Sequence, residues 1–246
     1  MDLSISKPNG IDIPTDARRR AERLADGYLR TELVMREQGI QHTIVVFGGT
    51  RVPDSADTSD PEMTDYYRVA REFGSIVGHS GKGPRDCRVT LMTGGGPGIM
   101  EAANRGASEA GAKSIGLNIR LPHEQAPNRF ISDELSFNFQ YFAIRKLHFL
   151  LRAKALVVFP GGFGTMDELF ETLNLVQCRR IQPLPILLVG EEFWRRAIDF
   201  DFLLERGLID PEDRQLFWYA ETAEQIWNDI LEWYARAGKP LFCDDG

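Results

Sequence analysis

Short runs of apolar residues alternate along this chain with longer segments in which apolar residues recur at three- and four-residue intervals. The short runs are rich in branched side chains, and several of them end in glycine or are preceded by proline. Runs of this kind are typical of strands that are buried on both faces of a sheet. The pattern predicts strands at residues 43–47, 88–92, 114–119, 155–159 and 185–189.

The longer segments have the periodicity of amphipathic helices. They are expected at residues 16–38, 62–77, 99–110, 141–153, 165–178, 192–205 and 223–237. Pro14 precedes the first segment and Gly39 follows it, and these residues are start and stop signals for a helix. Because this helix comes before the first strand, we expect residues 1–40 to form an N-terminal helical extension and residues 41–246 to form one domain.

The order of these elements predicts the fold class. Strands that alternate with helices make βαβ units, whose parallel strands are covered by helices on both faces of the sheet. We therefore predict an α/β fold with a doubly wound, Rossmann-like parallel sheet, helices on both faces and an N-terminal helical extension. In such sheets, ligands bind outside the carboxyl ends of the strands.

Composition and charge exclude several classes of protein. The net charge is −7 and no basic patch is present, so a nucleic-acid partner is not expected. No apolar segment is long enough to span a membrane, and residues 1–14 lack the apolar core of a signal peptide. Cys87, Cys178 and Cys243 fit neither a disulfide framework nor a metal site. We therefore expect a cytoplasmic protein with reduced thiols, no bound metal and no membrane partner.

Three glycine clusters follow predicted strands, at residues 48–49, 94–98 and 161–164. Glycine allows a backbone to approach a ligand closely, and the helix that follows offers free amide groups and the positive end of its dipole. This combination binds phosphate without lysine. A single cluster is equally consistent with a tight turn between a strand and a helix, but three clusters at one sheet edge favour a phosphate-binding site.

Two common types of nucleotide site are disfavoured. A P-loop requires lysine followed by serine or threonine after its glycines, and these clusters lack that lysine. A dinucleotide fingerprint requires glycine at the sixth position, where Ile99 stands counting from Gly94 and Asp167 counting from Gly162. Neither ATP hydrolysis nor NAD binding is therefore expected, and we predict no cofactor.

Thr165 and Glu168 are spaced in a way that has two explanations. Thr-x-x-Glu at a helix start is a capping box, in which the two side chains satisfy each other's backbone amides. Alternatively, Glu168 is a carboxylate that lies one turn inside a phosphate-binding loop and faces the sugar of a bound nucleotide. The spacing alone leaves both open.

Residues 160–168 match the PGGxGTxxE motif of the LOG ("lonely guy") phosphoribohydrolases, a family also labelled "possible lysine decarboxylase". Residues 94–101 resemble its second glycine motif, and Arg145-Lys146 resembles its arginine–lysine pair. The resemblance runs from about residue 43 to about residue 231. The N-terminal helix and the turn at residues 47–51 look like those of the longer bacterial members. Gly49-Thr50 departs slightly from the usual Gly-Ser of the family.

The resemblance implies hydrolysis of nucleoside 5′-monophosphates, with cytokinin riboside monophosphates or AMP as substrates and a dimer or larger homo-oligomer as the assembly. It also implies that Arg145 and Glu168 are the catalytic pair. The decarboxylase label has no support in the residues, because no lysine lies in a recognisable pyridoxal phosphate loop. Residues expected to bind the substrate are Thr50, Arg51, Gly95, Gly96, Glu101, Gln125, Asn128, Lys146, Gly161, Gly162, Gly164, Thr165 and Asp167.

Other functions remain open at this point. The fold also suits a carrier that binds a nucleotide or a molybdopterin-type cofactor without hydrolysing it, although the pairing of Arg145 with Glu168 argues against this. A hydrolase of purine or pyrimidine monophosphates for salvage is equally compatible with the motifs. A structural or interaction protein would leave the three glycine clusters unexplained.

Overall fold

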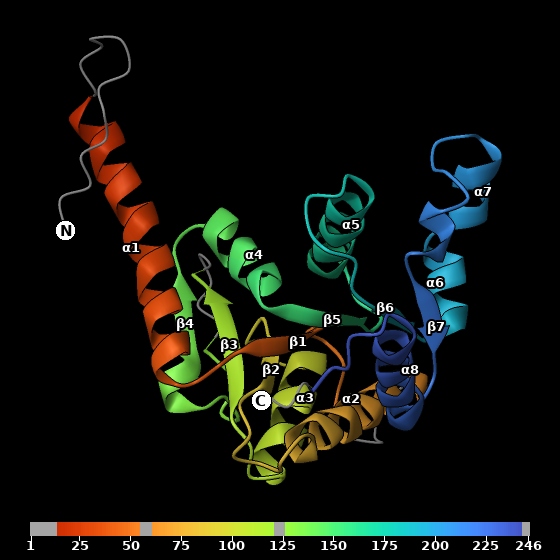
Figure 1. Ribbon diagram of the computed structural model, residues 1–246, viewed down its shortest axis with the longest axis horizontal. Coiled ribbons are helices and arrows are strands. Elements are labelled where there is room, and N and C mark those ends of the chain that lie inside the picture. Colours follow the sequence, from red (N-terminus) through yellow and green to blue (C-terminus); the bar gives the residue numbers. More distant parts are fainter. Residues whose placement is uncertain (1–13, 55–60, 121–125, 243–246) are drawn as a thin grey trace.

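A computed structural model describes residues 14–54, 61–120 and 126–242. Its centre is a parallel sheet of seven strands in the order β4-β3-β2-β1-β5-β6-β7 (Figure 1). The order reverses between β1 and β5, so the predicted doubly wound α/β fold is confirmed. The strands are β1 (His42–Phe47), β2 (Val89–Thr93), β3 (Ser114–Ile119), β4 (Ser136–Phe139), β5 (Ala153–Val158), β6 (Ile186–Val189) and β7 (Trp218–Ala220).

Helices cover both faces of this sheet (Figure 1). One face carries α2 (Pro61–His79), α3 (Ile99–Glu109) and α8 (Ala223–Arg236). The other carries α1 (Thr15–Glu37), α4 (Phe142–Leu151), α5 (Phe163–Gln177) and α6 (Glu191–Ala197), with α7 (Phe200–Glu205) beside α6. Short 3₁₀ helices lie at Asp133–Leu135 and Asp213–Gln215. No helix in the described ranges is long and apolar enough to cross a membrane.

The central strand shows how the sequence builds two cores. Side chains of a strand point alternately to the two faces of a sheet. In β1, Ile44 and Val46 pack against α2 and α3, whereas Val45 and Phe47 pack against the opposite helix layer. All four are buried, which explains why this strand is a continuous apolar run.

Two edge strands and one helix differ from the sequence prediction. β4 was not predicted from the sequence, and only every second residue of it is buried, because it lies at the sheet edge. β7 has only three residues and closes the other edge. The helix expected at residues 192–205 is interrupted at Ile198, and Asp199 caps a second helix by accepting a hydrogen bond from the Phe202 amide at 2.8 Å.

The N-terminal helix α1 packs against α4. Tyr28 stacks on His148 with ring centroids 5.1 Å apart. Glu32 forms an ion pair with Arg152 at 2.8 Å, and Met35 is fully buried. The helix therefore contributes to the core on the face of the sheet that carries α4 and α5.

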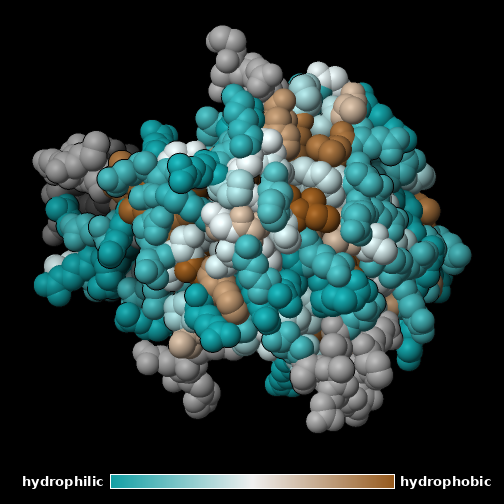
Figure 2. Space-filling model, turned by 90° about the horizontal axis from the view of Figure 1, so that it is seen from below, coloured by the Kyte–Doolittle hydropathy of each residue, from teal (hydrophilic) through white to brown (hydrophobic). Residues whose placement is uncertain are grey.

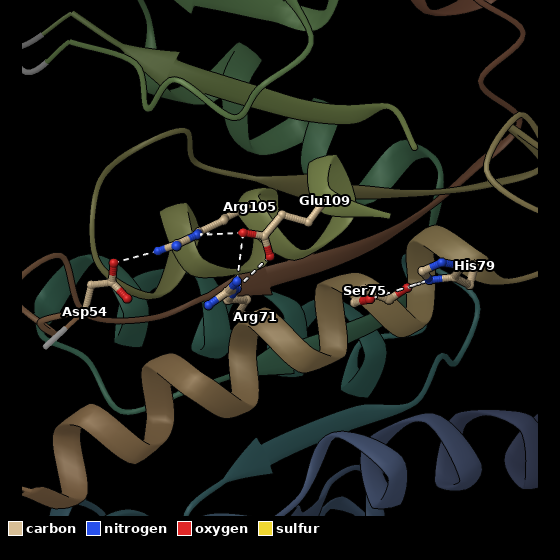
Figure 3. A network of polar contacts seen from close by, with 6 residues as sticks. All are labelled: Asp54, Arg71, Ser75, His79, Arg105 and Glu109. Atoms are coloured by element: carbon tan, nitrogen blue, oxygen red, sulfur yellow. Dashed lines mark hydrogen bonds and ion pairs between the residues drawn. The ribbon is translucent and has the colours of Figure 1, made fainter. Parts of the chain in front are cut away.

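On the opposite face, a polar network connects α2, α3 and the loop after β1 (Figure 3). Arg71 on α2 and Arg105 on α3 share the carboxylate of Glu109, at 2.7 and 3.0 Å. Arg105 also reaches Asp54 in the loop after β1 at 2.6 Å. The surface on this side of the molecule is mostly hydrophilic, with small separate hydrophobic areas (Figure 2).

Candidate active site

The three glycine loops lie together at the carboxyl ends of β2, β1 and β5, which are adjacent strands. They border a cleft of about 740 Å³. The position where strand order reverses is where ligands bind in open α/β sheets. The cleft is lined by Phe47, Gly48, Gly49, Thr50, Arg51, Val52, Met63, Gly94, Gly96, Met100, Asn118, Ile119, Ala126, Phe142, Arg145, Pro160, Gly161, Gly162, Phe163, Gly164, Thr165, Asp167, Glu168 and Phe193.

Backbone hydrogen bonds through Gly49 connect the three loops. The Gly49 amide donates to the carbonyl oxygen of Pro160 at 2.8 Å, in the loop after β5. The Gly49 carbonyl accepts from the Ile99 amide at 3.1 Å, at the start of α3. The first loop therefore fixes the positions of the other two, and the cleft floor is a connected backbone surface.

The second glycine loop is supported from below by a buried network of amide and hydroxyl groups. Asn104 accepts from the Thr93 hydroxyl at 2.7 Å and from the side-chain amide of Asn128 at 3.0 Å. The Asn128 amide also donates to Gly96 O at 3.1 Å, and its oxygen accepts from the Phe130 amide at 3.2 Å. The side chain of Asn128 is thus engaged in holding the loop, and a direct contact with substrate would require these bonds to rearrange.

The third glycine loop leads directly into α5. The helix begins at Phe163 with Gly162 as its N-cap, and no side chain caps it. The capping-box explanation of Thr165 and Glu168 is therefore wrong, because the N-cap is Gly162, three residues before the position that the box requires. The exposed amides at this end, together with the helix dipole, form a site that favours an anion.

Arg145 on α4 reaches the sheet edge beside this cleft. Its Nε donates to Leu117 O at 2.7 Å and its Nη2 to Gly94 O at 3.4 Å. The guanidinium also lies over the ring of Phe149, 5.1 Å from its centroid. Burial lowers the pKa of Arg145, and the negative charge of Glu168 opposes that shift. Because arginine titrates so far above neutrality, it remains a cation in the cleft.

Glu168 on α5 is buried, with 7% of its surface exposed, and it lines the same cleft. Burial raises the pKa of Glu168 to about 7. The positive charges of Lys146 and Arg145 act against this shift, and the carboxylates of Glu171 and Asp167 add to it. A carboxyl group that titrates near neutral pH in a cleft is suited to proton transfer.

Lys146 lies between α4 and α5 and contacts carboxylates of α5. Its Nζ is 2.9 Å from Asp167, 3.0 Å from Glu171 and 3.7 Å from Glu168. Although burial acts against its charged form, the hydrogen bonds with Asp167 and Glu171 raise the pKa of Lys146. The residue is therefore a fixed cation behind the cleft wall.

The structure brings most of the predicted site residues to one place. Those that line the cleft are Thr50, Arg51, Gly96, Arg145, Gly161, Gly162, Gly164, Thr165, Asp167 and Glu168. Gly95, Glu101, Asn128 and Lys146 lie outside the lining, and Gln125 lies outside the described residues. No group of three potential metal-ligating side chains occurs among the residues that the structure describes.

Several cleft residues were not predicted from the sequence. Asn118 stands at the carboxyl end of β3, and its amide donates to Phe137 O at 3.1 Å. Its position at the end of a predicted strand was a signal for it. Phe142 begins α4, and Met63 and Phe193 come from α2 and α6. No local pattern marks Met63 or Phe193, because the packing of whole helices brings them to the cleft.

The chain resembles known proteins over most of this domain. The model of a family described as "Possible lysine decarboxylase" matches residues 100–230, which is more than half of the chain. The cytokinin riboside 5′-monophosphate phosphoribohydrolase LOG3 of Arabidopsis thaliana is 26% identical over 153 residues, covering 59% of this chain and 68% of that protein. The probable phosphoribohydrolase LOGL5 of Oryza sativa subsp. japonica is 26% identical over 145 residues, or 56% of each chain.

Two solved structures resemble the chain to different degrees. The X-ray structure of the structural genomics target TM1055 matches with a TM-score of 0.54 at 20% identity, over 78% of this chain and 99% of that one. A molybdenum cofactor binding protein from Rippkaea orientalis matches with a TM-score of 0.48 at 22% identity, over 77% of this chain and 95% of that one. The likeness to TM1055, at 20% identity, bears on the fold alone.

Proposed function

The chain belongs to the LOG family, whose model is described as possible lysine decarboxylase, and from this we propose that it is a phosphoribohydrolase of nucleoside 5′-monophosphates. It would hydrolyse the N-glycosidic bond and release a free base and ribose 5-phosphate. The observation that carries the proposal is that Arg145 and Glu168 line one cleft with an uncapped helix N-terminus. The names of the relatives from Arabidopsis and rice support the same chemistry.

The substrate phosphate would bind at the start of α5. The amides of residues 163–165 come at the positive end of the helix, and Gly162 has no side chain to cap them. Thr165 is buried against the loop, and a Cβ built on Gly161 would lie 2.2 Å from its hydroxyl oxygen. Only glycine at position 161 allows this close approach. Binding energy from the phosphate would then position the sugar next to Glu168.

Cleavage of the bond would pass through a transition state with positive charge on the ribose. Glu168, as a carboxylate, would accept a proton from a water molecule while the water oxygen forms a bond to C1′. The C1′–N bond breaks, its electron pair leaves with the base, and the base takes up the proton from Glu168 to become the free base. Arg145 offers a cation at the same edge of the cleft, where it would stabilise the phosphate or the negative charge that develops on the departing base.

The walls of the cleft suit an aromatic base. Met100, Ile119, Phe142 and Phe193 line it, and these side chains offer apolar surface with no charge. Cytokinin riboside monophosphates and AMP are the substrates that we propose first. An apolar pocket discriminates weakly between similar bases, so other purine and pyrimidine monophosphates belong in the same test.

Decarboxylation of lysine is not proposed, despite the family's description. A pyridoxal phosphate enzyme holds its cofactor as a Schiff base with lysine. No lysine is among the described residues that line the cleft. Lys146, which is nearest to the motif, is occupied by three carboxylates.

The proposal is tested by incubating the purified protein with AMP, GMP, CMP, UMP and isopentenyl-AMP, and by measuring free base by chromatography. Adenosine, which lacks the phosphate, is the control. We expect base from at least one monophosphate and none from adenosine, and we expect Glu168→Gln to abolish turnover while nucleotide binding persists. Tight binding with no release from any monophosphate would contradict the proposal and favour a nucleotide or cofactor carrier.

We also propose that the protein is a homo-oligomer. Leu147 and Leu151, one turn apart on α4, are exposed apolar side chains. Apolar residues gathered on one face are typical of an interface.

A further inference from the structure

Lys146 is the residue that connects the two helices that carry the proposed catalytic pair. It follows Arg145 on α4, and its ammonium group contacts three carboxylates of α5. Asp167 and Glu171 accept its two short contacts, at 2.9 and 3.0 Å, and Glu168 lies at 3.7 Å. These carboxylates flank Glu168 in the sequence and share its side of the helix.

The position of Lys146 does not suit a ligand of the substrate phosphate. Only 16% of its side chain is exposed, and the residue is not part of the cleft lining. Its short contacts are with Asp167 and Glu171, which follow residues 163–165, where we place the phosphate. A phosphate would have to displace both carboxylates in order to reach it.

We propose that Lys146 is a positioning residue, which holds the carboxylates of α5 in place and favours the ionised form of Glu168. This proposal rests on the proposed function for its effect on turnover, but it also makes a statement about Glu168 itself. It differs from the expectation, based on the sequence, that Lys146 binds the substrate.

The charges around Glu168 show why this lysine matters. Two cations, Lys146 and Arg145, and two carboxylates, Glu171 and Asp167, act on it, in addition to burial. The guanidinium of Arg145 is held by the carbonyl groups of Leu117 and Gly94, so it is not free to move toward Glu168. Removing the charge of Lys146 would leave a buried carboxyl beside two unneutralised carboxylates, and the pKa of Glu168 would rise further.

Two substitutions are expected to move the titration of Glu168 in opposite directions. Lys146→Met removes the cation and should shift the midpoint upward by about one pH unit. Glu171→Gln removes a like charge and frees Lys146 to approach Glu168, so the midpoint should shift downward. Lys146→Arg keeps the positive charge, so the midpoint of Glu168 should stay close to that of the wild type. Lys113→Met is the matched control, because Lys113 pairs with Glu134 at 3.2 Å and is not part of the cleft.

The experiment measures the same titration in two ways. The first is the pH dependence of kcat on the best monophosphate substrate. The second is a carbon-13 NMR titration of glutamate carboxyl groups, with Glu168→Gln used to assign the resonance. The proposal predicts that Lys146→Met is nearly inactive below neutral pH and recovers most of its rate at alkaline pH. A lysine needed only for folding would instead lower kcat equally at every pH.

The direction in which the Glu168 midpoint moves in each variant decides whether the proposal holds. An unchanged or lowered midpoint in Lys146→Met overturns the proposal, as does an unchanged or raised midpoint in Glu171→Gln. If Lys146→Met does not fold, Glu171→Gln and Lys146→Arg still decide it. If the wild type hydrolyses no nucleotide, the proposed function fails, and the NMR titration alone decides whether Lys146 controls Glu168.

Discussion

Arg145 donates a hydrogen bond from Nε to the carbonyl oxygen of Leu117 at 2.7 Å, which attaches α4 to the carboxyl end of β3. A second contact, from Nη2 to Gly94 O at 3.4 Å, reaches the end of β2. No carboxylate of the described residues forms an ion pair with this guanidinium. A half-buried cation that is held only by carbonyl groups keeps its charge available to a ligand, which is typical of a functional site rather than of a structural ion pair.

Arg145→Lys should therefore lower kcat strongly even though the charge is kept. A lysine has a single ammonium group and cannot bond to Leu117 O and Gly94 O in the planar geometry of arginine. We expect a loss of about 100-fold or more in kcat, which is the usual effect of removing one group that stabilises transition-state charge. Steady-state kinetics with the best monophosphate measures it. Arg180→Lys, at an exposed position, is the control and should leave kcat unchanged. A fully active Arg145→Lys would contradict the role.

Gly94→Ala should disturb the same arginine from the other side. A Cβ at position 94 would lie 2.6 Å from Nη2 of Arg145 and 2.9 Å from the sulfur of Met100. Because Nη2 ends a long side chain, the arginine would move away while the fold persists. We expect kcat to fall by roughly tenfold or more, since misplacement of a catalytic group by about 1 Å has large effects. Near-wild-type kcat in a folded Gly94→Ala protein would show that the position of Arg145 is not critical.

The control for this variant is Gly27→Ala on α1. A Cβ at position 27 would meet only Ile144, at the ordinary contact distance of 4.0 Å. Alanine is a better helix former than glycine by roughly 0.5–1 kcal/mol, so this variant should keep kcat and melt at a slightly higher temperature. The comparison separates a specific effect at the cleft from a general effect of adding a methyl group.

The sequence was sufficient to predict the centre of the fold, and most of the residues that it singled out for a site line one cleft. The runs at β1 and β5 are apolar on both faces, and that local signal does not depend on the rest of the chain. The edge strands gave no such signal: β4 buries only every second residue, and β7 is too short for a pattern. Their assignment depends on hydrogen bonds to a neighbouring strand, which a single sequence does not reveal.

In the site too, the local features could be predicted from the sequence and the contacts between separate elements could not. The glycine loops are local features, and they lie where the strand order places them. The contacts of Lys146 depend on how α4 and α5 are placed relative to one another, so its engagement with Asp167 and Glu171 was not foreseen. The start of α5 also differed, because Gly162 serves as the N-cap where the Thr165–Glu168 spacing had suggested a later start.

An oligomer that uses α4 should be sensitive to a charge on this helix. Leu151 is 46% exposed at the end of α4, and Leu147 lies one turn before it. We expect light scattering coupled to size exclusion to show a dimer or larger species for the wild type. Leu151→Glu would bury a charge in the interface and should yield a smaller species. Leu208→Glu is the control, because Leu208 is 68% exposed and follows α7 instead. A monomeric wild type would rule out this interface.

Glu168→Gln should make the protein more stable at alkaline pH even as it abolishes turnover. The pKa of Glu168 in the folded protein is about 7, against 4.5 as the ordinary value, because burial disfavours the charged form. Between these two values the folded state binds more protons than the unfolded state, so wild-type stability falls as pH rises. Glutamine stays neutral and avoids this loss, which amounts to an upper estimate of about 3 kcal/mol above pH 7.

Thermal or urea unfolding of wild type and Glu168→Gln at about pH 5 and about pH 8 measures the difference. We expect similar stability at the lower pH and a clear advantage for Glu168→Gln at the higher pH, because only there does the wild type hold a buried carboxylate. The same substitution at Glu192, whose side chain is 77% exposed on α6 and is not part of the cleft, should not show this dependence. An equal difference in stability between the two proteins at both pH values would mean that packing, rather than ionisation of Glu168, causes the difference. An alkaline-specific gain would instead show that the cleft maintains a carboxylate at a cost to folding, as proton transfer near neutral pH requires.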